Sequence, residues 1–181
     1  MLQITIPAKE LWDDVNLEFI NVKKHTLQLE HSLVSISKWE SKWCKPFYSK
    51  EEKTYEETID YIKCMTLTQN VQPEVYRCLT KQNVKDITDY IEAPMTATTF
   101  SDKSGKKGSG NSIVTAELVY YWMTALNIPM ECQKWHINRL FTLIRVCEIK
   151  NQPEKKVSSA ERINQYAKMN AERRAKLNSK G

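Results

Sequence analysis

The stretch Ile113-Val-Thr-Ala-Glu-Leu-Val-Tyr-Tyr-Trp-Met-Thr-Ala-Leu126 is the most apolar part of the sequence and bears most directly on the fold. Eleven of its fourteen residues are apolar, so a helix formed here is apolar on nearly all sides. Asn127-Ile-Pro129 ends this helix, and a second helix is predicted from about Met130 to Ile149. The three-residue connection predicts an antiparallel helical hairpin at the centre of the core.

The N-terminal thirty residues have the alternating pattern of β-strands. Leu2, Ile4 and Ile6 alternate with polar residues, which predicts a strand ended by Pro7. Two further strands are predicted at 17–22 and 26–30. We expect these two strands to form a hairpin around Lys23-Lys24.

Between the strands and the apolar hairpin the pattern is helical. Ser32 is a predicted N-cap, and apolar residues follow it every three or four positions as far as Trp43. Thr54-Tyr-Glu-Glu57 is a capping box, in which the Thr hydroxyl and the Glu carboxylate satisfy free backbone amides. Pro73 opens a short helix, and an apolar stripe over 84–91 predicts another that ends before Pro94.

Composition places the chain among ordinary globular proteins, at 181 residues with 41% hydrophobic and 27% charged residues. No apolar run reaches the roughly 20 residues that cross a bilayer, so no membrane association is expected. Five cysteines without a Cys-x-x-Cys pair favour a reducing compartment. The start of the chain has no pattern of a secretion signal, so the cytoplasm is expected.

Glycine is almost confined to one place. Three of the four glycines fall between Gly105 and Gly110, inside a polar stretch predicted to be a flexible spacer over 101–111. Phosphate-binding loops and nucleophile elbows need glycine for positive φ or for close approach to a ligand, and outside this stretch the one glycine is Gly181. Most nucleotide enzymes are therefore disfavoured. We therefore expect no enzyme activity, no catalytic residues and no cofactor.

Cys132 and His136 are the best candidates for a metal or catalytic pair, because they lie four positions, or one helical turn, apart in the predicted helix. A zinc site needs three or four ligands, and no further Cys or His has regular spacing with these two. A buried thiol and a hydrogen-bonded histidine are the simpler interpretation, so no metal site is predicted. The acidic residues at 51–57 are interpreted as the start of a helix, because carboxylates favour its positive end.

Two segments are candidates for binding a partner. Trp39 and Trp43 lie one helical turn apart and form either a binding face or part of the core; the sequence leaves both open. From Lys150 to the end, nine Lys or Arg and three Glu give a net charge of +6, while the whole chain carries +5. A polar helix is predicted from Ser158 to about Leu177, and its candidate contact residues are Ile163, Tyr166, Arg173 and Arg174.

These patterns predict an α+β fold that is predominantly α-helical. A small N-terminal β-sheet or hairpin is followed by a helical bundle and a polar C-terminal helix. We expect a core domain at 1–152, which includes the spacer, and a basic helical arm at 153–181.

Several strings of the sequence are distinctive. They are Leu27-Gln-Leu-Glu-His-Ser-Leu-Val-Ser-Ile-Ser-Lys-Trp-Glu-Ser-Lys-Trp43, Tyr120-Tyr-Trp-Met-Thr-Ala-Leu-Asn-Ile-Pro129, Trp135-His-Ile-Asn-Arg-Leu140 and the closing Asn170-Ala-Glu-Arg-Arg-Ala-Lys-Leu-Asn-Ser-Lys-Gly181. With them the chain resembles the tail assembly chaperones of long-tailed bacteriophages over nearly its whole length. The resemblance implies binding to the tape measure protein, help with tail tube polymerisation, absence from the finished virion, and often a longer form made by frameshifting.

The resemblance identifies no binding residues, but it implies a location and partners. The location is the host cytoplasm, and the partners are the tape measure protein and the tail tube protein. Self-association of the chain is also left open. Two alternatives stay open: a phage structural or host-factor-binding protein, and a small nucleic-acid-binding protein that acts through the basic arm. The second is less favoured, because Tyr166 is the only aromatic residue of the arm.

Overall fold

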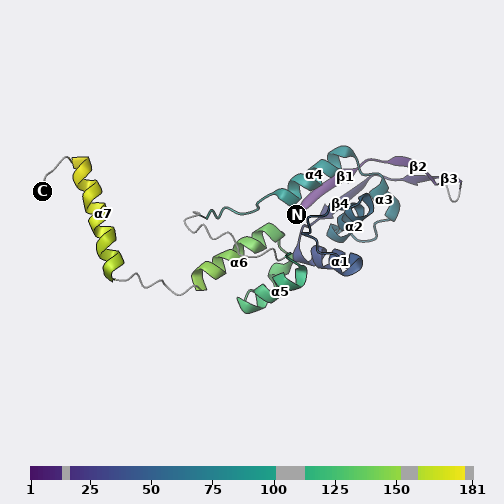
Figure 1. Ribbon diagram of the computed structural model, residues 1–181. Coiled ribbons are helices and arrows are strands. Elements are labelled where there is room, and N and C mark those ends of the chain that lie inside the picture. Colours follow the sequence, from purple (N-terminus) through teal and green to yellow (C-terminus); the bar gives the residue numbers. More distant parts are fainter. Residues whose placement is uncertain (14–16, 101–112, 152–158, 178–181) are drawn as a thin grey trace. The chain divides into compact units, whose positions relative to one another are not determined.

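The computed structural model describes residues 1–13, 17–100, 113–151 and 159–177. In these residues the chain is α+β and mostly helical, with its strands at the N-terminus (Figure 1), which confirms the predicted fold class. The chain divides into two compact units, Met1–Glu148 and Ile149–Gly181. The predicted spacer at 101–111 and the predicted cap Ser158 lie outside the described residues.

The strands form two antiparallel pairs with a common register. Ile6 lies opposite His25 and Lys9 opposite Val22, so the two pairs are consecutive parts of one long hairpin. Pro7 separates them, because it has no N–H to donate to a partner strand. The pairs are β1 (Leu2–Ile6) with β4 (His25–Leu29) and β2 (Lys9–Asp13) with β3 (Glu18–Val22).

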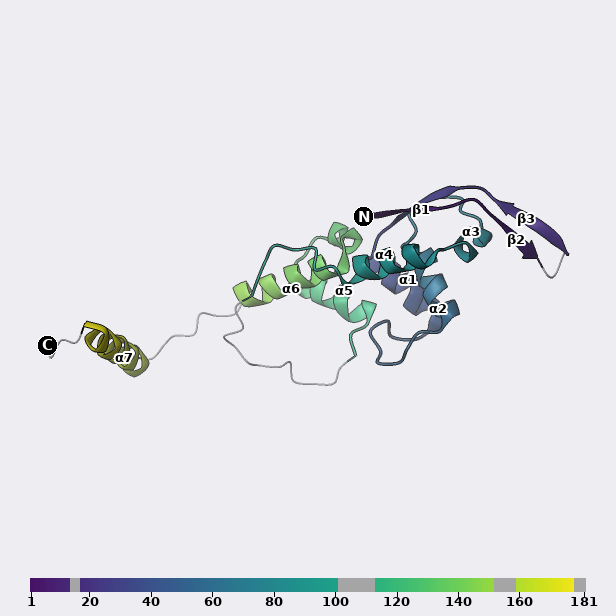
Figure 2. The same ribbon diagram turned by 90° about the horizontal axis from the view of Figure 1, so that it is seen from above.

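The predicted pairing of the strands at 17–22 and 26–30 is therefore wrong. The strand β3 pairs instead with β2, and β4 pairs with β1. The strand β2 escaped prediction because its burial is weak: only Leu11 and Asp13 are even half-buried. Figures 1 and 2 show β2 and β3 extending past the helices as a two-stranded arm.

The helices begin where the sequence provides caps. The Ser32 hydroxyl accepts from Ser35 N at 3.3 Å, and Thr54 and Thr80 cap the next long helices in the same way. Pro73 opens the short helix at its first turn. These helices are α1 (Leu33–Trp43), α2 (Tyr55–Met65), α3 (Pro73–Arg77) and α4 (Lys81–Glu92).

The C-terminal part of the first unit differs from the predicted helical hairpin. The helix α5 (Ala116–Ala125) ends before Asn127 as expected, but the predicted helix at 130–149 is two elements, η1 (Met130–Lys134) and α6 (Ile137–Asn151). The helix breaks because the backbone at His136 forms a β-bridge with Ser32, and Ile137 N donates to His31 O at 2.8 Å. A long-range backbone contact thus overrides the local helical pattern.

The core is centred on α1 rather than on the pair of helices at 113–149, which corrects the prediction. The helix α1 contacts α2, α5 and η1, and α4 covers β1. The α5 and α6 helices still contribute, through Val119, Met123 and Leu140 among others. The buried hydrophobic residues with no more than 1% exposure are Ile6, Leu27, Leu29, Leu33, Ile36, Trp39, Met65, Val75, Ala116, Val119, Met123, Ile137 and Leu140.

Candidate partner-binding site

Trp39 and Trp43, one of the two predicted partner-binding segments, hold α1 against α2. Trp39 is 1% exposed, and its Nε1 donates to Glu57 O at 2.8 Å. Trp43 is half-buried, and its Nε1 donates to Asp60 Oδ2 at 3.0 Å, while Lys42 pairs with the other oxygen of the same carboxylate. The prediction that Trp39 binds a partner is therefore wrong, because its buried side chain has no surface that a partner could contact. Trp43 is largely engaged with α2.

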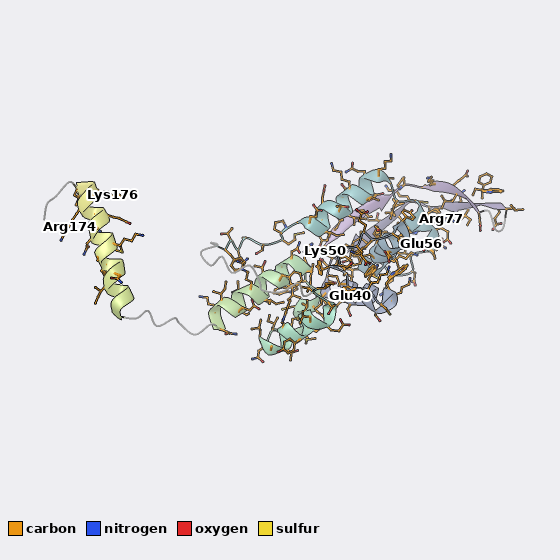
Figure 3. The ribbon with its side chains drawn as sticks, in the orientation of Figure 1. Glu40, Lys50, Glu56, Arg77, Arg174 and Lys176 are labelled. Atoms are coloured by element: carbon orange, nitrogen blue, oxygen red, sulfur yellow. The ribbon has the colours of Figure 1, made fainter. Side chains whose placement is uncertain are left out.

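Glu40, also on α1, fixes the start of α5. Its side chain is buried, and its two carboxylate oxygens accept from Phe47 N and Ala116 N, each at 2.7 Å. Ala116 is the first residue of α5, so the carboxylate satisfies one of the free amides of that helix and lies at its positive end. Figure 3 labels Glu40 where α1 and α5 meet. This contact ties two segments that are 76 residues apart.

A buried polar cluster joins α1, α2 and the start of α6. His31 Nδ1 bonds the hydroxyl of Tyr61, and the rings of His31 and His136 lie 5.1 Å apart. His136 Nε2 bonds Tyr90 O at 2.9 Å, and Asn138 N donates to His136 Nδ1, which requires the neutral ring. Burial, with a smaller effect from His136, lowers the pKa of His31 to about 3.

A mixed-charge cavity of about 260 Å³ opens beside this cluster. Glu30 is its central charge: one oxygen pairs with the N-terminal amine at 3.0 Å, and the other accepts from the Tyr90 hydroxyl at 2.6 Å. Burial and this hydrogen bond raise the pKa of Tyr90. Arg139 stacks on Trp135 at 4.1 Å. Glu30 thus links the amine of Met1 to Tyr90 of α4.

The structure separates the predicted Cys132/His136 pair. Cys132 lies in η1 and His136 lies in the break before α6, so the two do not share a helical face. Both are buried, and the ring nitrogens of His136 are engaged as described above. Within the described ranges no group of three or more His, Cys, Asp or Glu side chains is arranged to hold a metal ion.

The second predicted segment forms a helix with exposed side chains. The helix α7 (Ser159–Leu177) presents Ile163 at 66% exposure and Tyr166 at 65%, and Arg173 and Arg174 are also exposed. Spacings of three residues place Ile163, Tyr166 and Met169 along one side of the helix. In Figure 3 the labelled side chains of Arg174 and Lys176 project from α7. This helix brings together four predicted contact residues: two apolar and two cationic.

Two exposed apolar surfaces were missed by the sequence reasoning. Trp12 and Phe19 lie opposite each other on the arm formed by β2 and β3, with their rings 4.9 Å apart and both side chains exposed. On α5, Tyr121 is 66% exposed and Ala125 is exposed. The sequence did contain a signal for the second surface, because a helix that is apolar on all sides needs other elements or a partner packed on all sides.

No protein-family model, curated protein or solved structure matched this chain in comparisons with known proteins. Across the described part of the chain, no helix combines the length and the apolar character needed to span a membrane.

Proposed function

We propose that this protein is a tail assembly chaperone of a long-tailed bacteriophage. In this role it binds the tape measure protein in the host cytoplasm, assists polymerisation of the tail tube around it, and leaves before the virion is complete. The proposal rests on the four distinctive strings of sequence that resemble this family. It assigns no catalytic or cofactor-binding residue.

The exposed helix α7 is the observation that best supports a binding role. Most helices in proteins gain their stability by packing an apolar face against other elements rather than from helix propensity. The apolar side of α7, with Ile163, Tyr166 and Met169, is exposed in this structure. A second helix that packs on this side would bury it, and an extended helical client provides such a partner.

The charge of α7 favours rapid encounter with an acidic client. The sequence of the helix contains five Lys or Arg and two Glu, a net charge of +3. Exposed charges of this kind accelerate association more than they tighten a complex. The same charge would attract nucleic acid, but Tyr166 alone provides a poor platform for stacking bases.

Co-expression with the tape measure protein of the same phage tests this role. The full chain should retain the client in a pull-down, and Tyr166→Asp should release most of it, because the variant places a charge on the apolar side of α7. Asn164→Asp is the matched control: it adds the same charge on the other side of the helix and should retain the client. A chain that ends at Gln152 should behave as Tyr166→Asp does.

The outcomes separate the proposal from its alternatives. Equal capture by the full chain, Tyr166→Asp and the shortened chain would remove α7 from binding. No capture by any of them would refute the proposed partner. Nucleic acid that co-purifies, and that moderate salt releases, would support the nucleic-acid alternative.

A further inference from the structure

The helix α5 has an apolar side that points away from the core. Ala116, Val119 and Met123 face the core and are buried. On the other side, Leu118 is half-buried, and Tyr121 and Ala125 are exposed. We call Leu118, Tyr121 and Ala125 the outer face of α5; Figure 1 shows this helix at the lower margin of the first unit. A solvent-facing side of a helix is normally polar, so this face is a candidate for cover by a partner.

The charge around the outer face indicates what would cover it. Helix α5 contains one charged residue, the exposed Glu117, and no Lys or Arg. A complementary partner is therefore a helix with a short apolar stripe and flanking cations.

The sequence of this chain contains such a helix. In α7, Ile163, Tyr166 and Met169 form an apolar stripe about 9 Å long, at 1.5 Å per residue. The outer face, from Leu118 to Ala125, is about 10 Å long by the same measure. The cations Arg173 and Arg174 follow the stripe. The stripe and the outer face thus have similar lengths, both are apolar, and the charges beside them are opposite in sign.

We infer that the outer face of α5 binds α7 of a second copy of this chain. The exchange is reciprocal in a two-fold dimer, because each copy contributes one α5 face and one α7 stripe. In such a dimer each α7 stripe lies on the outer face of the other copy, so a client that binds the same stripe would displace this contact. The inference concerns self-association and does not depend on the proposed client.

The test is the oligomeric state of the full chain, measured by light scattering and sedimentation over micromolar concentrations. The full chain should reach twice the monomer mass. Tyr121→Asp and Tyr166→Asp should each give monomers, and both residues are exposed, so folding should be retained by circular dichroism. Asn164→Asp should still dimerise.

Mixing the two monomeric variants is the decisive experiment. The Tyr166→Asp copy keeps its outer face, and the Tyr121→Asp copy keeps its stripe, so one contact is regained and a heterodimer should form. Monomers at every concentration for the full chain would overturn the inference, and so would dimers that neither substitution affects. Failure of the mixture to associate, when each variant is a folded monomer, would overturn the pairing of α5 with α7. Tyr121→Asp leaves α7 intact, so capture of the tape measure protein separates this result from failure of the proposed function.

Discussion

Acidification should destabilise the first unit through the buried histidine His31. This side chain is 2% exposed and bonds Tyr61, and burial holds its pKa at about 3, against 6.5 for an exposed histidine. A group whose pKa is lower in the folded protein stabilises the fold above its unfolded pKa. That stability is lost as the pH falls from 6.5 toward 3.

The magnitude follows from the shift. Each pH unit below 6.5 costs about 1.4 kcal/mol, so His31 alone removes about 2 kcal/mol between pH 7 and pH 5. Burial also lowers the pKa of His136, which adds an effect of the same sign. The hydrogen bond from Lys45 lowers the pKa of Glu57, so that carboxyl titrates below this pH window.

The assay is urea unfolding followed by tryptophan fluorescence, with the free energy of unfolding compared at pH 7 and pH 5. Between pH 7 and pH 5 the free energy of unfolding should change by about 2 kcal/mol less in His31→Gln than in the wild type. This expectation holds whatever the substitution does to stability at pH 7. Tyr61→Phe is the control: it removes the hydroxyl but keeps the buried ring, so the pH dependence should persist. An identical pH dependence in the wild type and in His31→Gln would refute the account of this cluster.

Three further predictions concern the fold. Glu40→Ala leaves Phe47 N and Ala116 N without an acceptor and should cost about 2–5 kcal/mol in urea unfolding, whereas exposed Ser41→Ala should cost little; equal effects would contradict the role of Glu40. Leu140→Ala should lower stability by about 2–5 kcal/mol through a cavity, and Leu67→Ala, whose side chain is 55% exposed, by less than about 0.5 kcal/mol. Thermal melting can check this order, and the reverse order would disprove the place of Leu140 in the core. Cys132→Ser and His136→Gln should alter stability only; stoichiometric zinc in protein purified without added metal, lost in either variant, would count against this prediction.

The parts of the fold that could be predicted depend on local chemistry. Ser32 and Thr54 begin α1 and α2 because their hydroxyls satisfy backbone amides three residues later, and those residues are adjacent in the sequence. Pro94 and Asn127 likewise mark helix ends that need no information from the rest of the chain. The fold class followed from such local signals.

The parts that could not be predicted depend on distant residues. The break between η1 and α6 arises from the bridge between Ser32 and His136, which the pattern around Trp135 does not reveal. The strand partners were wrong because Lys23-Lys24 resembles a turn, whereas the register is set across the whole hairpin. For the candidate site, burial of Trp39 depends on acceptors in α2, while the exposed stripe of α7 was readable because that helix has few apolar residues to bury.

Quantitative mass spectrometry of two samples tests whether this protein binds the tape measure protein during assembly and leaves before the virion is complete. One sample is the complex purified with a tagged copy of this protein from infected cells during tail assembly, and the other is purified virions. We expect the tape measure protein to be abundant in the complex and this protein to be missing from the virions. This protein at stoichiometric amounts in virions, or a complex without the tape measure protein, would contradict the account and favour a structural or host-factor-binding role.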